Sequence, residues 1–209
     1  MDEALLEALL PYSTTTDEYI RSMIENSADV NAVNYGGLNA LQLVAMTNRG
    51  MRLFLTIIAN TDDINHQDVW GRTALMIAVI SDNIDVVRAL MYDKRLKINI
   101  QTHPSPNGLN YTALHFAALS RHYEMVKQLM GKTEDNIVEE FADGKIDTEI
   151  KNALGDTAWD IAWRNGDYKI AFLIRGRVTR QSTKAAQSAK AAQSAIPAQP
   201  GHDDFNLRF

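Results

Sequence analysis

The 209-residue sequence contains no cysteine. This absence excludes a disulfide framework, a zinc site built from thiolates and a cysteine nucleophile. Long apolar runs are also missing, since no segment approaches the roughly 18 apolar residues that a membrane-spanning helix needs. The first residues, Met1-Asp2-Glu3, are acidic where a secretory signal is basic. We therefore expect no signal peptide, no membrane span and a cytoplasmic location.

Positive charge is scarce in most of the chain. Residues 1–174 carry 15 basic and 24 acidic side chains, whereas residues 175–209 carry 6 basic and 2 acidic ones. An acidic body repels phosphates, so we expect no nucleic-acid partner. The stretch from Arg175 to Lys190 has five positive charges and no acidic residue. It is either a solvated tail or a contact for an acidic partner, RNA or a membrane surface.

The sequence is rich in internal repeats. Four similar segments, at residues 37–45, 71–79, 110–118 and 155–163, contain Ala40, Ala74, Ala113 and Ala158 at spacings of 34, 39 and 45. A second apolar pattern with helical spacing follows each segment, near residues 53–58, 86–91, 125–130 and 170–174. A third element recurs as Ala28-Asp29-Val30-Asn31, Asp63-Ile64-Asn65 and Lys97-Ile98-Asn99. Such a period is typical of stacked structural repeats.

These elements resemble the ankyrin-repeat family, whose repeat carries Gly-x-Thr-Pro-Leu-His-x-Ala-Ala, a second apolar helix and Ala-Asp-Val-Asn. The resemblance covers roughly residues 17–174. Asn110 replaces one glycine, and every repeat has alanine where the family prefers proline. Asparagine tolerates the left-handed backbone that glycine supplies. The resemblance implies an all-α solenoid of helix–turn–helix repeats with projecting β-turn fingers.

The spacing of the repeats predicts six parts. They are a degenerate N-terminal capping repeat at 1–33, repeats at 34–66 and 67–101, a repeat at 102–151 with an acidic insertion at 131–151, a C-terminal capping repeat at 152–177, and a low-complexity tail at 178–209. The tail repeats Lys-Ala-Ala-Gln-Ser-Ala twice between 184 and 195, which cannot pack a core, so we expect it to be disordered. Its end, Phe205–Phe209, is either a linear docking motif or an unused terminus.

Several helix ends can be located from the sequence. Thr73, Thr112 and Thr157 stand where a hydroxyl would cap the first helix of a repeat. In the N-terminal repeat, a short amphipathic helix is expected over Asp2–Leu10, and Thr16 or Asp17 caps the next one. The acidic residues Asp2, Glu3 and Glu7 suit a solvated outer face.

The last repeat carries two unusually large residues. Trp159 replaces the family's leucine, and Trp163 replaces an alanine. Two interpretations remain open: the indoles close the end of the core, or they form an aromatic binding pocket.

The sequence offers little for catalysis or metal binding. Five histidines are present, at positions 66, 103, 115, 122 and 202, and none pairs with an acidic residue at metal-ligand spacing on a helix. The resemblance implies that His115 ties its turn together and that His122 is structural. Placing Gly144 at position 6 of a calcium loop puts Phe141 and Ile150 where oxygen ligands are needed, which excludes that site. We therefore expect no cofactor, no metal and no enzyme, with a site in the 131–151 insertion as the contrasting alternative.

Function should then reside on the variable surface of the stack. The resemblance implies partner-binding positions on the finger tips and on the exposed end of each first helix, which together form a concave face. The candidates are Tyr35, Leu38, Met46, Val69, Trp70, Arg72, Ile80, Leu109, Tyr111, Leu119, Leu154 and Arg164.

An apolar stripe follows from the repeat register. Met46, Ile80 and Leu119 occupy the same position in three successive repeats, flanked by the finger aromatics Tyr35, Trp70 and Tyr111. An apolar, aromatic surface of this kind favours protein binding. The alternative is that these side chains fold back on neighbouring fingers and only add stability.

We therefore expect a monomeric, non-catalytic adaptor or inhibitor that binds another protein on this face. A second hypothesis is a secreted effector of an intracellular bacterium, acting on a host protein in the host cytosol. The degenerate repeats and the low-complexity tail that ends in hydrophobic residues suit this second hypothesis.

Overall fold

The computed structural model describes residues 2–47, 49–104, 109–131 and 146–175. Within these ranges the regular elements are helices, joined by loops that contain one isolated β-bridge between Val33 and Asn39. The expected tail at 178–209, with its Phe205–Phe209 motif, and most of the insertion at 131–151 lie outside the described residues.

The described helices form five successive pairs. The first helix of each pair is α1 (Asp2–Ala8), α3 (Ala40–Ala45), α5 (Ala74–Ile80), α7 (Ala113–Leu119) or α9 (Ala158–Arg164). The second is α2 (Asp17–Glu25), α4 (Met51–Ala59), α6 (Ile84–Met91), α8 (Tyr123–Leu129) or α10 (Tyr168–Arg175). Each pair coincides with one copy of the sequence repeat.

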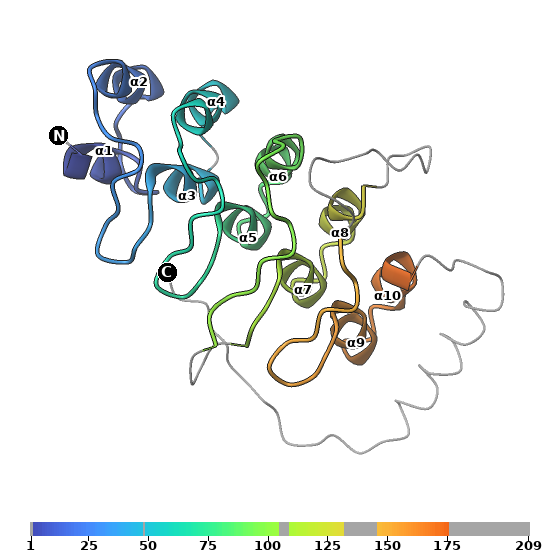
Figure 1. Ribbon diagram of the computed structural model, residues 1–209. Helices are drawn as coiled ribbons and strands as arrows, with labels where there is room; N and C mark the ends of the chain where they lie inside the picture. The colour runs from blue at the N-terminus through green and yellow to red at the C-terminus, as the bar shows by residue number, and fades with distance from the viewer. Residues whose placement is uncertain (1, 48, 105–108, 132–145, 176–209) are drawn as a thin grey trace.

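The pairs stack side by side into a curved array with two rows of helices (Figure 1). The inner row is continuous, because α1 packs on α3, α3 on α5, α5 on α7 and α7 on α9. The outer row runs from α2 through α4, α6 and α8 to α10 in the same way. The long loops between one pair and the next project beyond the inner row, as the fingers (Figure 1). The expected all-α solenoid is confirmed.

Side-chain caps fix where the inner helices begin. The hydroxyls of Thr73, Thr112 and Thr157 accept hydrogen bonds from the backbone N–H three residues ahead, at 3.2–3.4 Å. Thr16 caps α2 in the same way. Each such bond satisfies a donor that the first turn leaves unpaired and stabilises the helix by about 1 kcal/mol. These predicted caps are confirmed.

The core lies between the two rows and continues from pair to pair. Small residues at one position of the inner helices, Ala78, Ala117 and Ala162, are fully buried and allow the paired helices to approach closely. Larger side chains such as Leu41, Leu75 and Leu114 are buried in the same continuous core. Because each pair leaves an apolar face for the next one to cover, the array is stable only as a stack.

Aromatic residues close the C-terminal end of the described core. Trp159 and Trp163 stack with ring centroids 5.1 Å apart, and Tyr168 and Phe172 meet Trp163 edge-on. The Arg175 guanidinium lies 3.6 Å from the centre of the Trp159 ring. Both indoles are partly buried against the core. This arrangement supports the interpretation that they close the end of the core.

Arg49 holds the first pair of helices to the second. Its guanidinium donates to the carbonyl oxygens of Ala8 and Thr15, at 2.8 and 2.9 Å, and to the Asp17 carboxylate at 2.9 Å. These bonds tie the loop between α1 and α2 to the start of α4. The degenerate first repeat is thereby locked onto the stack, an attachment that sequence patterns did not reveal.

Candidate protein-binding surface

Side-chain oxygens of Asn34, Asp68 and Asn152 determine the shape of three fingers. Each oxygen accepts two backbone N–H bonds, from the second and fourth residues ahead, at 2.8–3.0 Å. This bonding folds the chain into a tight turn whose tip points away from the helices. Two tip residues of each finger are therefore held in fixed positions.

Backbone hydrogen bonds join each finger to the next. The N–H of Val69 donates to Gly36, that of His103 to Trp70, and that of Ala153 to Leu109, at 2.9–3.2 Å. The fingers thus form one connected edge along the array. A partner that lies across this edge meets a preorganised surface, which lowers the entropy cost of binding.

A left-handed residue ends each tip. Gly37, Gly71, Asn110 and Gly155 occupy this position, with φ between +52° and +82°. Asn110 therefore adopts the backbone that the other repeats assign to glycine, as predicted. At Gly71 a Cβ atom would lie only 2.2 Å from the backbone nitrogen of His103, so this finger also requires a residue without a side chain.

Large apolar side chains are exposed on the finger tips. Tyr35 is fully exposed, and Val69, Trp70 and Leu154 are each more than half exposed. The Trp70 indole is held on one side by the Arg72 guanidinium, 4.5 Å from the ring centre. Arg72 is itself bonded to Asp68 at 2.7 Å. Trp70 thus combines exposure with a fixed orientation, which suits a binding anchor.

The inner-helix stripe is only partly exposed. Leu119 is 42% exposed, whereas Met46 and Ile80 are partly buried. The fourth repeat position in this row holds Arg164, whose side chain is 62% exposed and bonded to Asp156 at 2.5 Å. The stripe is therefore apolar through three repeats and polar at its C-terminal end. The bond to Asp156 raises the pKa of Arg164.

Two further residues that were predicted to bind a partner, Tyr111 and Leu38, are more buried than the sequence predicted. Tyr111 is half-buried, stacks on His115 and meets Phe116 edge-on, and burial raises the pKa of its phenol. Leu38 is only 9% exposed, so the expectation that it presents a surface is wrong. The equivalent residues Arg72 and Asp156 are polar and stay near the surface, whereas a leucine gains free energy by folding into the core. Leu109 is partly exposed.

His115 is a structural residue. Its Nδ1 accepts a hydrogen bond from the Thr112 N–H at 3.1 Å, and its Nε2 contacts the Asp156 carbonyl oxygen at 3.2 Å. Burial lowers the pKa of this imidazole. Among the described residues, no group of three or more histidine or acidic side chains could hold a metal ion. The expected role of His115 in tying its turn is confirmed.

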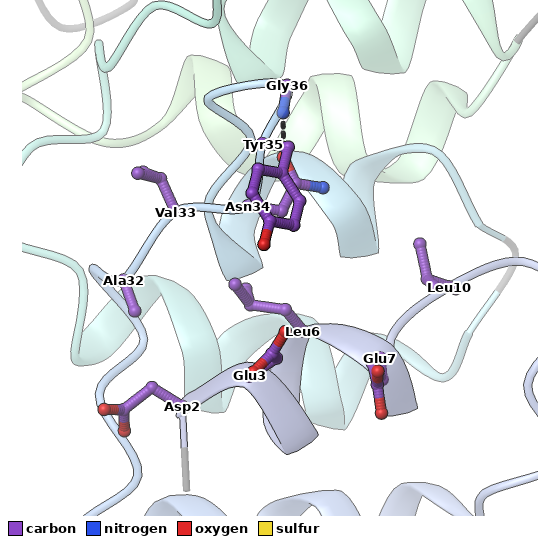
Figure 2. Close-up of a pocket in the computed structure, with 10 residues that line it drawn as sticks. All are labelled: Asp2, Glu3, Leu6, Glu7, Leu10, Ala32, Val33, Asn34, Tyr35 and Gly36. Atoms are coloured by element: carbon purple, nitrogen blue, oxygen red, sulfur yellow. Dashed lines mark hydrogen bonds between the residues drawn. The ribbon is translucent and has the colours of Figure 1, made fainter.

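The inner helix of the first pair also faces the fingers. Glu3 and Glu7 are exposed, as expected for a solvated face, and together with Asp2 they line a groove opposite the first finger (Figure 2). Helical spacing alone could have put Glu3, Leu6 and Glu7 on one side of α1. It could not show which neighbour that side faces.

Among the described helices, none is long and apolar enough to cross a membrane.

Comparison with known proteins agrees with this geometry. A family model described as "Ankyrin repeats (3 copies)" matches residues 7–102 and 44–140. Alpha-latrotoxin-Lg1a of Latrodectus geometricus is 29% identical over 142 residues, which are 68% of this chain and 9% of that protein. The chain thus matches only a small part of that relative.

Proposed function

Because the chain belongs to the ankyrin-repeat family, we propose that it is a non-catalytic adaptor or inhibitor that holds a partner protein against its fingers and inner helices. A protein-binding role is what ankyrin repeats suggest in general. The finer proposal places the partner on the surface made by Tyr35, Val69, Trp70, Ile80, Leu119 and Leu154, which is called the concave surface below.

One observation carries this proposal: several large apolar side chains stay exposed on one connected edge. Tyr35, Trp70 and Leu154 come from three fingers, and backbone hydrogen bonds link neighbouring fingers along the array. Exposed aromatic and apolar side chains along one edge favour a protein-binding role. A partner that covers Trp70 would remove its indole from water without having to order it first, because Arg72 already holds the ring.

A non-catalytic role is supported by the shape and chemistry of the described surface. The surface along the fingers and inner helices is open to water, whereas catalysis favours an enclosed site that excludes water. The buried histidine, His115, has both ring nitrogens engaged in structural contacts. The alternative of a secreted effector rests on the degenerate repeats, the absence of cysteine and the tail, and the tail lies outside the described residues. This alternative stays a prediction, as do the monomeric state and the cytoplasmic location.

A pull-down with two matched variants tests the proposal. Trp70→Ala with Ile80→Ser removes apolar groups from the concave surface, whereas Tyr19→Ala with Leu55→Ser removes exposed apolar groups from the outer helices α2 and α4. The proposal expects a protein that the wild type and the outer-helix variant capture and the concave variant does not. Equal capture by all three would place binding elsewhere.

A further inference from the structure

A groove of about 570 Å³ lies between α1 and the first finger (Figure 2). One wall is the side of α1 that carries Glu3, Leu6 and Glu7, together with Leu10 just beyond the end of the helix. The other wall is the finger segment 32–36, from which the Tyr35 side chain points toward α1 (Figure 2). Its volume falls within the roughly 300–1,000 Å³ of clefts that bind ligands.

The interior of the groove is apolar and remains open to water. Leu6 is buried and forms its floor, while Leu10 and Ala32 are partly exposed beside it. Val33 is half exposed and Tyr35 fully exposed at the finger wall. A guest side chain placed there would cover apolar surface on both walls, which contributes about 25 cal/mol for each Å² removed from water.

The rim of the groove carries unpaired negative charge. Glu3 and Glu7 are exposed and stand one helical turn apart on α1. Neither carboxylate forms an ion pair or a hydrogen bond with another residue in the described part of the chain. Asp2 is different, because its carboxylate accepts a bond from the Asp29 N–H at 3.0 Å. The two glutamates are therefore available for a guest.

From this geometry we infer that the groove binds a peptide segment of the partner protein that presents an arginine or lysine beside a bulky apolar residue. The apolar side chain lies on Leu6 beside Tyr35, and the cation meets Glu3 and Glu7 on the rim. This inference rests on the proposed function, because the first finger carries both Tyr35 of the concave surface and the groove wall. It adds the chemistry of the partner, which the finger tips alone do not specify.

Charge favours this occupant over others. The body of the chain carries 15 basic and 24 acidic residues over positions 1–174, so anionic segments are repelled before they reach the rim. A cationic segment is attracted to two carboxylates whose charge is not already compensated by a described residue. Exposed ion pairs are individually weak, so the apolar contact supplies most of the affinity and the charges supply selectivity.

Three synthetic peptides test the inference on the full chain labelled with ¹⁵N. The first alternates arginine and leucine, the second alternates glutamate and leucine, and the third alternates arginine and serine. We expect the arginine–leucine peptide to shift the backbone amide signals of Glu3, Glu7 and residues 33–36. The other two should bind at least about tenfold more weakly, because each lacks one of the two contacts.

Two variants with the same change in net charge locate the contact. Glu3→Gln with Glu7→Gln should raise the Kd of the arginine–leucine peptide about threefold to tenfold, in line with two exposed ion pairs. Glu18→Gln with Glu25→Gln, at exposed sites on α2, should leave that Kd unchanged. The amide spectrum of each variant shows directly that its fold is kept.

Three results would overturn the inference: no shifts with the arginine–leucine peptide, shifts confined to other surfaces, or equal losses in the two glutamine variants. These results are separable from failure of the proposed function. If the peptide does not bind but protein capture still depends on Trp70 and Ile80, only the groove inference fails. If the peptide binds the groove and capture ignores Trp70 and Ile80, the concave-surface proposal fails instead.

Discussion

At the scale of single residues, Gly71 and Gly155 have the same backbone conformation in different surroundings. Both have left-handed φ values, +77° and +82°. A Cβ atom at Gly71 would strike the backbone of His103, whereas a Cβ at Gly155 would meet no heavy atom within 4 Å. We expect Gly155→Ala to lower the free energy of unfolding by about 1–2 kcal/mol, the cost of a left-handed alanine.

The same substitution at Gly71 should cost about 1–3 kcal/mol more, because the finger must also move away from His103. Urea unfolding of the two variants measures the difference. Equal losses would show that the contact between neighbouring fingers is loose in solution.

His115 makes stability depend on pH near neutrality. Burial lowers the pKa of its imidazole from the usual 6.5, so the unfolded chain binds a proton more readily than the folded one. The contribution of neutral His115 to the free energy of unfolding is therefore fully present above about pH 6.5. It is lost as the pH drops below that value, by at most about 1.4 kcal/mol per pH unit. Protonation of Nδ1 would also break its bond from the Thr112 N–H.

His115→Gln isolates this effect from that of the other histidines. Gln42 holds the equivalent position, where it accepts a bond from the Asn39 N–H at 3.0 Å and donates to the Arg72 carbonyl oxygen at 2.7 Å. Glutamine can thus replace both contacts without titrating. Thermal melts from pH 7.5 to 5.5, a range of about two units around the imidazole's usual pKa, should fall less steeply for the variant. Parallel curves would contradict the assignment.

The conformation and role of a residue could be predicted from the sequence where short-range interactions determine them. The three threonine caps and the left-handed Asn110 follow from short-range hydrogen bonding and backbone sterics. Leu38 could not be predicted, because its repeat position is on the surface when polar residues occupy it. Whether a leucine there points outward or inward depends on space beneath the first finger, which spacing does not contain.

At the scale of elements, α9 and α10 end the described stack with an aromatic cluster. Trp159 occupies the position of a core leucine but is only partly buried, between Trp163 and Arg175. We expect Trp159→Ala to lower the free energy of unfolding by about 3 kcal/mol, the low end for loss of a large aromatic side chain.

Trp70→Ala is the matched control for this prediction. Trp70 is 57% exposed on a finger, so the same substitution should cost less than about 1 kcal/mol. Denaturant unfolding with tryptophan-independent detection compares the two. Near-wild-type stability of the Trp159 variant would mean that the indole does not close the core and would favour an aromatic pocket.

The order and type of the helices were predictable from the sequence, but the contacts that hold the first helix pair to the second were not. The repeat spacing indicates helix pairs and fingers because each copy buries the same apolar positions. The Arg49 contacts to Ala8 and Thr15 join residues more than 30 positions apart through backbone carbonyls, which carry no sequence signature. The groove beside α1 could not be predicted either, because it depends on how α1 packs against the first finger.

At the scale of the whole molecule, the sequence predicts that the array is stable without its tail. Residues 184–195 contain no apolar side chain larger than alanine, so they offer little surface to bury. A chain shortened to residues 1–177 should melt within about 5 °C of the full chain, a difference worth roughly 1 kcal/mol. A larger fall in the melting midpoint would show that residues 178–209 pack on the core.

Binding on the concave surface is the central claim, and one titration tests it most directly. The protein captured in the pull-down is titrated by calorimetry against the wild type, the Trp70→Ala with Ile80→Ser variant, and the Tyr19→Ala with Leu55→Ser variant. Central anchors contribute roughly 2 kcal/mol or more each, so the concave variant should bind at least about a thousandfold more weakly. The outer-helix variant should match the wild type. An unchanged Kd in the concave variant, with its melting curve intact, would contradict the claim.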